Sequence, residues 1–167
     1  MGVLGTRRKP FQDSPTPAGN SVAAIALLRL YSYTNQPGYR EKAEQTLELL
    51  AGLAGKFGIF VATYGVAAVH FSQPHTQIVI IGDDALAEQL HTVAATLFGI
   101  GRSVLKLPTN QAIAQNLPPG LAETLPHLAE LTGRKSAAVL CSGFSCQPPI
   151  FDPEQLRQEL ARLRSRV

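Results

Sequence analysis

The spacing of apolar and polar residues divides the chain into a helical first part and a second part in which strands alternate with helices. After an irregular, proline-bearing lead-in over residues 1–19, the segment 21–34 (SVAAIALLRLYSYT) is apolar almost all round, with Arg29 as its only charge. A helix of this kind is usually covered on several sides. We therefore expect a first helix, beginning near Asn20, that needs neighbours around it.

Two more helices are predicted before residue 73. Residues 39–55 (YREKAEQTLELLAGLAG) have the spacing of an ordinary amphipathic helix. Residues 57–71 (FGIFVATYGVAAVHF) form the longest apolar run, which is shorter than the roughly 20 residues that cross a bilayer. We predict a buried helix there and no membrane span. The inner face of the second helix is predicted to consist of Ala43, Leu47, Leu50 and Ala54.

The pattern changes after Gln73. Short apolar runs at 76–81 (TQIVII), 102–108 and 135–142 predict three buried strands. A helix over 84–99 separates the first two, with Asp83 or Asp84 as its N-cap. Between the second and third strands the sequence is a polar, proline-bearing loop. This loop is predicted to hold a helical turn at 110–115 and a weak helix at 121–131 that Pro126 interrupts.

The chain closes with a predicted helix over residues 152–167. Asp152 has the right side chain for an N-cap, and Pro153 suits the first helical position because its missing N–H would have no partner there. The inner face of this helix is predicted to carry Leu156, Leu160 and Leu163.

Strands that alternate with helices favour a parallel sheet with right-handed crossovers. The expected fold class is therefore mixed α/β, with N-terminal helices packed on a small three-stranded parallel α/β unit of strand order 2-1-3. We expect a lead-in over residues 1–19, a helical segment over 20–72 and the small α/β unit over 73–167.

Charge and leader sequence limit the partners and the location. The net charge is +3, and the basic residues gather near the two ends without interleaved aromatic side chains, so no nucleic-acid partner is predicted. The first 20 residues contain charges and prolines but no long apolar run, so no export signal is predicted. We therefore expect a cytoplasmic protein, in which cysteines are normally reduced.

The two cysteines of the chain, Cys141 and Cys146, stand in the stretch CSGFSCQPP. Five extended residue steps span about 16 Å, whereas a disulfide needs Cα atoms within about 7 Å. The pair could therefore meet only through a hairpin-like turn, which Gly143 permits. The preferred interpretation is two buried, reduced residues. The alternatives are a functional redox pair, or a zinc site shared with His70 and His75, for which the C-x4-C spacing is unusual.

The remaining motifs identify no reaction. The sequence VIIGDD ends a strand at a glycine turn, but it lacks a G-x-G-x-x-G pattern and a phosphate-binding lysine, and its two aspartates would repel a phosphate. Helix capping explains it better. No catalytic triad or separated carboxylate pair can be located from spacing. No cofactor and no metal are predicted, and whether the chain is an enzyme stays open.

Four stretches together resemble a known family, the thioredoxin-domain-containing, spermatogenesis-associated (YyaL-like) proteins. PTPAGNSVAAIALLRL and YREKAEQTLELLA resemble a late helical segment of that family, and QIVIIGDD resembles one of its strands. AAVLCSGFSCQPPIFDPEQL resembles its extreme C-terminus, where two cysteines flank an aromatic residue before the last helix. The family pattern has serine where this chain has Ala18.

The resemblance implies the C-terminal portion of a larger protein. The missing parts would be a thioredoxin-like domain and most of an (α/α)6 toroid similar to N-acylglucosamine epimerases and six-hairpin glycosidases. The chain opens with GVLGTRRK, which does not resemble the family, and joins the family pattern midway along that pattern. We therefore expect a truncated or split gene product, or a C-terminal piece expressed separately.

A chain of this kind is expected to lack catalysis of its own and to need a partner: the missing upstream polypeptide or a second copy. One alternative is that it contributes to a carbohydrate-processing toroid assembled with another chain, with a carbohydrate ligand. Another is a redox-responsive module that uses Cys141 and Cys146. Asn20 and Ser21 match the family motif, which implies that they face the toroid mouth, although helix capping explains them equally well.

Overall fold

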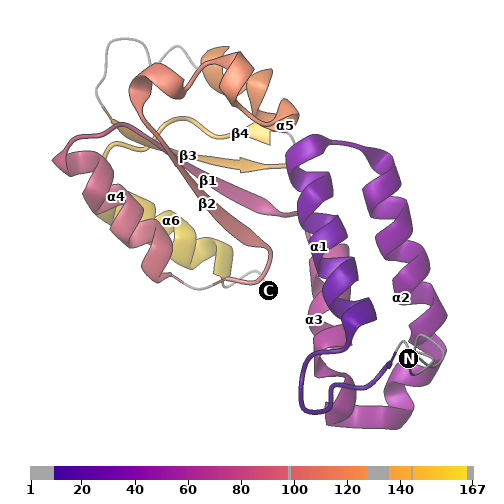
Figure 1. Cartoon of the computed structure of the whole chain (residues 1–167). Coiled ribbons are helices and arrows are strands. Elements are labelled where there is room, and N and C mark those ends of the chain that lie inside the picture. Colours follow the sequence, from indigo (N-terminus) through magenta and orange to yellow (C-terminus); the bar gives the residue numbers. More distant parts are fainter. Residues whose placement is uncertain (1–9, 98, 128–135, 144, 165–167) are drawn as a thin grey trace, which may run out of the picture. The chain divides into compact units, whose positions relative to one another are not determined.

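The computed structural model describes residues 10–97, 99–127, 136–143 and 145–164. It consists of two compact units (Figure 1). The helical unit comprises Met1–Tyr31 and Gln36–Gln73. The sheet unit comprises Ser32–Asn35 and Pro74–Val167. Each unit has its own buried cluster of apolar side chains, and each is described by itself below.

The helical unit contains α1 (Gly19–Thr34) as far as Tyr31, together with α2 (Pro37–Phe57), the 3-10 turn η1 (Gly58–Val61) and α3 (Ala62–Ser72). Small side chains dominate its core, which lets the helix backbones approach closely. The Tyr64 hydroxyl of α3 also donates a hydrogen bond to the Leu47 carbonyl of α2 at 3.2 Å. The core side chains are Ala24, Leu28, Ala43, Leu47 and Ala67. The predicted inner face of the second helix is confirmed, with Ala43 and Leu47 buried and Leu50 and Ala54 half-buried.

The chain reverses direction between α2 and α3 (Figure 1), and η1, which begins at Gly58, joins the two helices. This glycine has φ 53° and ψ −127°, a conformation that side-chain-bearing residues rarely adopt. By length and composition alone, Pro37–Ser72 could cross a membrane, because an 18-residue window within it has a mean hydropathy of 1.5, and 6% of that window is buried. One such stretch is weak evidence for a span, and here it forms a hairpin of two helices. The prediction of a buried helix over 57–71 is wrong, because within that range Ile59, Phe60 and Val66 are exposed.

The described residues of the sheet unit form four strands in the order β2-β1-β3-β4. β1 (Thr76–Ile81) and β2 (Arg102–Leu107) are parallel and are joined through α4 (Ala85–Thr96). β3 (Ala137–Ser142) lies on the other side of β1, so the predicted order 2-1-3 is confirmed. However, β3 runs antiparallel to β1, and the prediction of a three-stranded parallel sheet is wrong. The fourth strand, β4 (Ser145–Cys146), pairs antiparallel with β3 and was not predicted.

The connection between β2 and β3 explains the direction of β3. Leu107, at the end of β2, and Ala137, at the start of β3, both pair with Ile81, the last residue of β1. The connection therefore leaves the sheet and re-enters it at the same ends of the strands. A parallel β3 would need a crossover that runs back to the opposite ends of the strands. The described part of the connection instead forms short helical turns: η2 (Thr109–Gln111), η3 (Ala114–Asn116), α5 (Pro119–Ala122) and η4 (Leu125–His127).

The sheet is covered on both faces. Successive side chains of each strand point to opposite sides, so each strand contributes to two clusters. Ile78 and Ile80 face a cluster formed with α4 and α6 (Pro153–Arg164). Val79 and Ile81 face Leu117, Leu121 and Leu125 of the connection. We call residues 109–127 the cover segment, since they shield this second face.

The helix caps of the sheet unit agree with the sequence pattern. Asp84 accepts a hydrogen bond from the Ala87 N–H at 3.0 Å, and Asp152 accepts one from the Glu154 N–H at 2.9 Å. The predicted inner face of the last helix is confirmed: Leu156 and Leu160 are buried in the cluster, and Leu163 packs against it. Residues 1–9 of the lead-in, 128–131 of the predicted weak helix and 165–167 of the last helix lie outside the described residues.

Candidate functional site

The first candidate residues, Asn20 and Ser21, lie inside the first turn of α1 and not at its cap. The helix begins at Gly19, and the Val22 N–H already donates to the Ala18 carbonyl at 3.1 Å. The expectation that Asn20 or Ser21 caps the helix is therefore wrong. Ser21 is fully buried, and its Oγ has no hydrogen-bond partner among the described residues. Asn20 is half-buried.

Asp13, which the sequence analysis did not single out, does the capping. Its Oδ1 accepts from the Ala18 N–H at 2.7 Å, just before α1, and its Oδ2 accepts from the Thr63 N–H at 2.8 Å, in the first turn of α3. Its own N–H donates to the Phe60 carbonyl at 2.7 Å. These N–H groups hold the pKa of the Asp13 carboxyl below its usual value, with Thr63 the larger cause. One carboxylate therefore fixes the lead-in against two helix N-termini.

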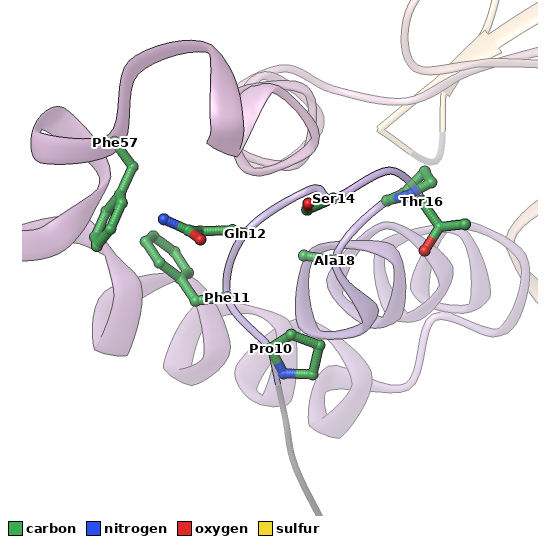
Figure 2. A pocket seen from close by; sticks show the side chains of 8 residues that line it. Pro10, Phe11, Gln12, Ser14, Thr16, Ala18 and Phe57 are labelled. Atoms are coloured by element: carbon green, nitrogen blue, oxygen red, sulfur yellow. The ribbon is translucent and has the colours of Figure 1, made fainter.

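A pocket of about 410 Å³ lies beside this capped loop (Figure 2). Phe11 and Phe57 lie at one end of it, with ring centroids 5.3 Å apart in an edge-to-face arrangement, and Thr16 lies at the other end. None of the side chains that line the pocket carries a charge, so the pocket suits an uncharged ligand and offers no group for acid–base chemistry. Its lining consists of Pro10, Phe11, Gln12, Ser14, Thr16, Pro17, Ala18 and Phe57.

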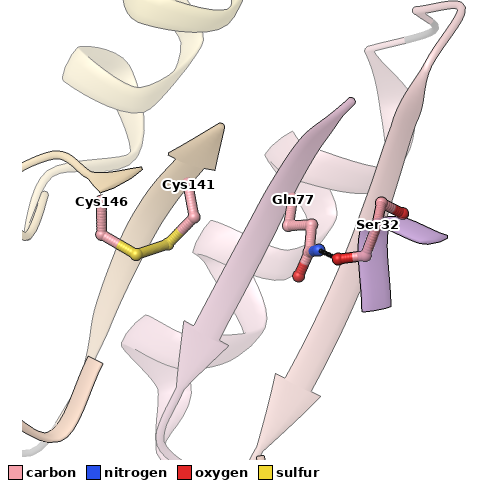
Figure 3. Close-up of a disulfide and its surroundings, with 4 residues drawn as sticks. All are labelled: Ser32, Gln77, Cys141 and Cys146. Carbon is pink, nitrogen blue, oxygen red and sulfur yellow. Dashed lines mark hydrogen bonds between the residues drawn. A yellow bond between two sulfur atoms is a disulfide. The ribbon is translucent and has the colours of Figure 1, made fainter. Parts of the chain in front are cut away.

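The second candidate pair, Cys141 and Cys146, forms a disulfide (Figure 3). The two residues are directly opposite each other on β3 and β4, with Cα atoms 4.0 Å apart. The adjacent pair is hydrogen-bonded, with the Gln147 N–H donating to the Leu140 carbonyl at 2.9 Å, so the cysteines occupy the position where opposed strands come closest.

The hairpin-like turn that the sequence permitted is therefore present. Gly143 supplies the positive φ, 55°, that a two-residue hairpin loop requires. The preferred interpretation of two reduced cysteines is wrong. Cys141 is buried, with 3% of its surface exposed, and Cys146 is half-buried.

Gln77 is a functional candidate that sequence reasoning missed. It lies on β1 directly opposite Cys141, and only 7% of its surface is exposed. Its Nε2 donates to the Ser32 carbonyl at 2.6 Å, which gives a partner to a carbonyl in the last turn of α1 (Figure 3). Its Oε1 is buried and has no hydrogen-bond partner among the described residues. The signal in the sequence was a lone amide side chain at the start of a strongly apolar strand.

The zinc alternative is not supported by the structure. Cys141 and Cys146 are bonded to each other, so neither can supply the thiolate that zinc requires. The His75 Nε2 is 3.0 Å from the Ser103 Oγ, within hydrogen-bond distance. Within the described ranges, no three His, Cys, Asp or Glu side chains are grouped closely enough to hold a metal ion.

His70, on α3, is expected to make the stability of the helical unit depend on pH. Burial is the main cause that lowers its pKa below the ordinary 6.5, and Arg29 acts in the same direction. The folded state therefore holds this proton less tightly than the unfolded chain, and protonation favours unfolding. The stability that neutral His70 contributes should be fully present above about pH 6.5 and should be lost as the pH falls through its folded pKa.

We expect His70→Gln to flatten this pH dependence. Urea midpoints of both proteins, measured between about pH 7.5 and pH 5, would show it. Parallel curves for the two proteins would mean that other groups cause the acid sensitivity.

Comparison with known proteins gives a distant similarity. No protein-family model matches the chain, and no solved structure matches it. The chain is 28% identical over 167 residues to human Spermatogenesis-associated protein 20, covering 94% of this chain and 20% of that protein. It is 26% identical over 149 residues to the uncharacterized protein B0495.5 of Caenorhabditis elegans, covering 88% of this chain and 20% of that protein. This chain spans about a fifth of the length of these curated relatives, and the similarity supports the family resemblance drawn from the sequence.

Proposed function

We propose that the chain acts as the C-terminal part of a longer protein similar to Spermatogenesis-associated protein 20, without catalysis of its own. In this proposal the helical unit completes a larger helical assembly with polypeptide outside this chain. The coverage supports it, since the relatives are about five times as long as the matched region. The observation that carries it is the apolar surface of the helical unit.

Exposed apolar side chains are concentrated in the helical unit. Among the described residues, nine large hydrophobic side chains are exposed, and seven of these belong to the helical unit. Leu49 is 80% exposed and Ile59 is 83% exposed. Apolar patches of this kind usually mark an interaction surface. The seven are Val22, Leu30, Leu49, Leu53, Ile59, Phe60 and Val66.

The positions of these residues suit packing against further helices. Leu49 and Leu53 are four residues apart on α2, so they lie on one face of that helix. Ile59 and Phe60 are two further exposed apolar side chains, in η1. A ring of helical hairpins, such as the (α/α)6 toroid implied by the resemblance, would cover a surface of this kind. A thioredoxin-like domain further upstream also belongs to the proposal.

The sheet unit, in contrast, buries most of its large apolar side chains within itself. Its two clusters enclose both faces of the sheet, and its exposed large hydrophobics among the described residues are Ile100 and Ile113. We therefore assign the need for a partner to the helical unit.

The pocket of Figure 2 favours a second candidate function, the binding of a carbohydrate within the completed assembly. Phe11 offers an aromatic ring, and Gln12, Ser14 and Thr16 offer neutral hydrogen-bonding groups, a combination that suits sugars. The pocket supports binding and not reaction, because the nearby Asp13 carboxylate is engaged by two backbone N–H groups.

The solution mass of the purified chain tests the first proposal. We expect association that grows with protein concentration and binding of a hydrophobic dye, because the apolar face has no cover. Leu49→Lys combined with Ile59→Lys should reduce both without changing the circular dichroism spectrum. Glu44→Gln is a control on the same helix, at an exposed position away from Leu49 and Leu53.

Light scattering after size-exclusion chromatography measures the mass. A clean monomer that binds no dye would contradict the proposal, because the helical unit would then be self-sufficient. A tight dimer of fixed stoichiometry would also contradict it, because a second copy would then be the partner.

A further inference from the structure

The Cys141–Cys146 disulfide lies between a short strand at the edge of the sheet and a buried cluster of the sheet unit. It links β3 to β4, which is two residues long and forms the end of the sheet. Cys141 is part of the cluster that holds the cover segment, and Cys146 packs against that cluster. The bond therefore connects an edge hairpin to one buried face of the sheet.

The two sulfur atoms differ in access. Cys146 is half-buried between the exposed residues Ser145 and Gln147, whereas Cys141 is buried. A reductant can therefore approach Cys146 from solvent more easily than Cys141. Access of this kind largely decides which sulfur of a disulfide is attacked.

Gln77 lies directly opposite Cys141 in the sheet. Its side chain shares the sheet face of Cys141, since the two residues are direct partners on β1 and β3, and directly opposed side chains lie within contact range. Figure 3 shows Gln77 between the disulfide and Ser32. The bond to Ser32 fixes the orientation of the amide, because only the nitrogen can donate to a carbonyl. Oε1 is then a buried acceptor to which no donor among the described residues is bonded.

A disulfide has no hydrogen to donate, whereas a thiol is a weak donor. We propose that Cys141–Cys146 is a reversible thiol–disulfide exchange site for a dithiol reductant, and that Gln77 stabilises the reduced form by accepting a hydrogen bond from the Cys141 thiol. The proposal is independent of the helical assembly proposed above. A cytoplasmic location, as the sequence analysis expects, would expose the site to dithiol reductants.

The dithiol reduces the disulfide in two exchange steps. A thiolate of the reductant attacks the Cys146 Sγ, the bond to the Cys141 Sγ breaks, and the Cys141 sulfur leaves with the electron pair and takes up a proton. The second thiol of the reductant then attacks the mixed disulfide as its thiolate and releases the Cys146 sulfur, which is also protonated. Two electrons pass to the hairpin, and the dithiol becomes a disulfide.

Dithiothreitol is the probe for the full chain. We expect the native protein to yield two alkylatable thiols in mass spectrometry at reductant concentrations that leave the circular dichroism of the sheet unchanged. Removal of the reductant in air should restore the disulfide. Reduction that occurs only when denaturant unfolds the chain would overturn the proposal, because the bond would then be purely structural.

Gln77→Leu tests the role of the acceptor. We expect its equilibrium constant for reduction to fall roughly threefold to tenfold, the range for one hydrogen bond. Ser145→Ala, an exposed change in the same hairpin, is the control and should leave the constant unchanged. An unchanged constant in Gln77→Leu would overturn the role of Gln77.

A measurement on the unmutated chain covers the case in which Gln77→Leu does not fold. In the reduced protein, the infrared S–H stretch of a hydrogen-bonded thiol should lie below that of a free thiol. Two bands at the free-thiol position would overturn the role of Gln77 without a variant.

Discussion

Leu47→Ala is expected to lower the free energy of unfolding by about 2–5 kcal/mol, whereas Leu49→Ala, two residues along the same helix, should change it by less than about 0.5 kcal/mol. Leu47 is 7% exposed and packs in the core of the helical unit with Leu28 and Ala67. Its loss would leave a cavity among small side chains that cannot move together to fill it. Leu49 is 80% exposed and leaves no cavity when it is truncated.

Urea unfolding at low protein concentration, followed by circular dichroism at 222 nm, would measure both variants. The two substitutions remove the same atoms from the same helix, so differences in helix propensity cancel between them. Equal losses of stability would mean that Leu49 is already covered in the isolated chain, and the apolar surface would then need another explanation.

The effects of Leu47→Ala and Leu49→Ala should differ less in the longer protein than in the isolated chain. If polypeptide outside this chain covers the helical unit, Leu49 becomes a buried residue there, and Leu49→Ala should then cost about as much as a core truncation. A substitution that is silent in the isolated chain and costly in the longer protein would identify the covered face directly.

Much of the sheet unit could be predicted because local patterns determine it. The three runs of apolar residues form β1, β2 and β3, and the caps at Asp84 and Asp152 follow from the side chain that each position requires. The direction of β3 could not be read from its own residues, since parallel and antiparallel strands buried on both faces have similar composition. The path of the connecting segment determines that direction.

In the candidate sites, too, local features could be predicted and contacts between distant residues could not. The Cys141–Cys146 pairing was reachable from the sequence as an alternative, because Gly143 permits the turn that brings the residues together. Asn20 and Ser21 were predicted as caps from residue type alone. Asp13 takes this role instead, through a contact with Thr63, 50 residues away, that local sequence patterns do not reveal.

The cover segment forms one buried layer of the sheet unit. Its prolines and polar residues predicted a loop, yet Leu117, Leu121 and Leu125 are buried against the second face of the sheet. These leucines are spaced four apart, a helical repeat that the prolines disguise. A segment with few regular hydrogen bonds can therefore form a full layer of the core through a few apolar side chains.

Leu121→Ala should lower the free energy of unfolding by about 2–5 kcal/mol, because Leu121 is 1% exposed and contacts the layer that includes Val79 and Val139. Ile113→Ala is the matched control in the same segment, where the side chain is 47% exposed, and should cost less than about 0.5 kcal/mol. Chemical denaturation measures both, and hydrogen exchange of the β1 amides would show whether the face opens locally.

Because Cys141 belongs to the same cluster as Leu121, the cost of Leu121→Ala should depend on the disulfide. Neighbours within one cluster usually show coupled effects, whereas distant sites add independently. We therefore expect the loss from Leu121→Ala to differ between the oxidised and dithiothreitol-reduced chains, while the loss from Leu160→Ala, in the cluster on the opposite face, stays the same. Identical losses for Leu121→Ala in both redox states would show that the hairpin and the cover segment are not coupled.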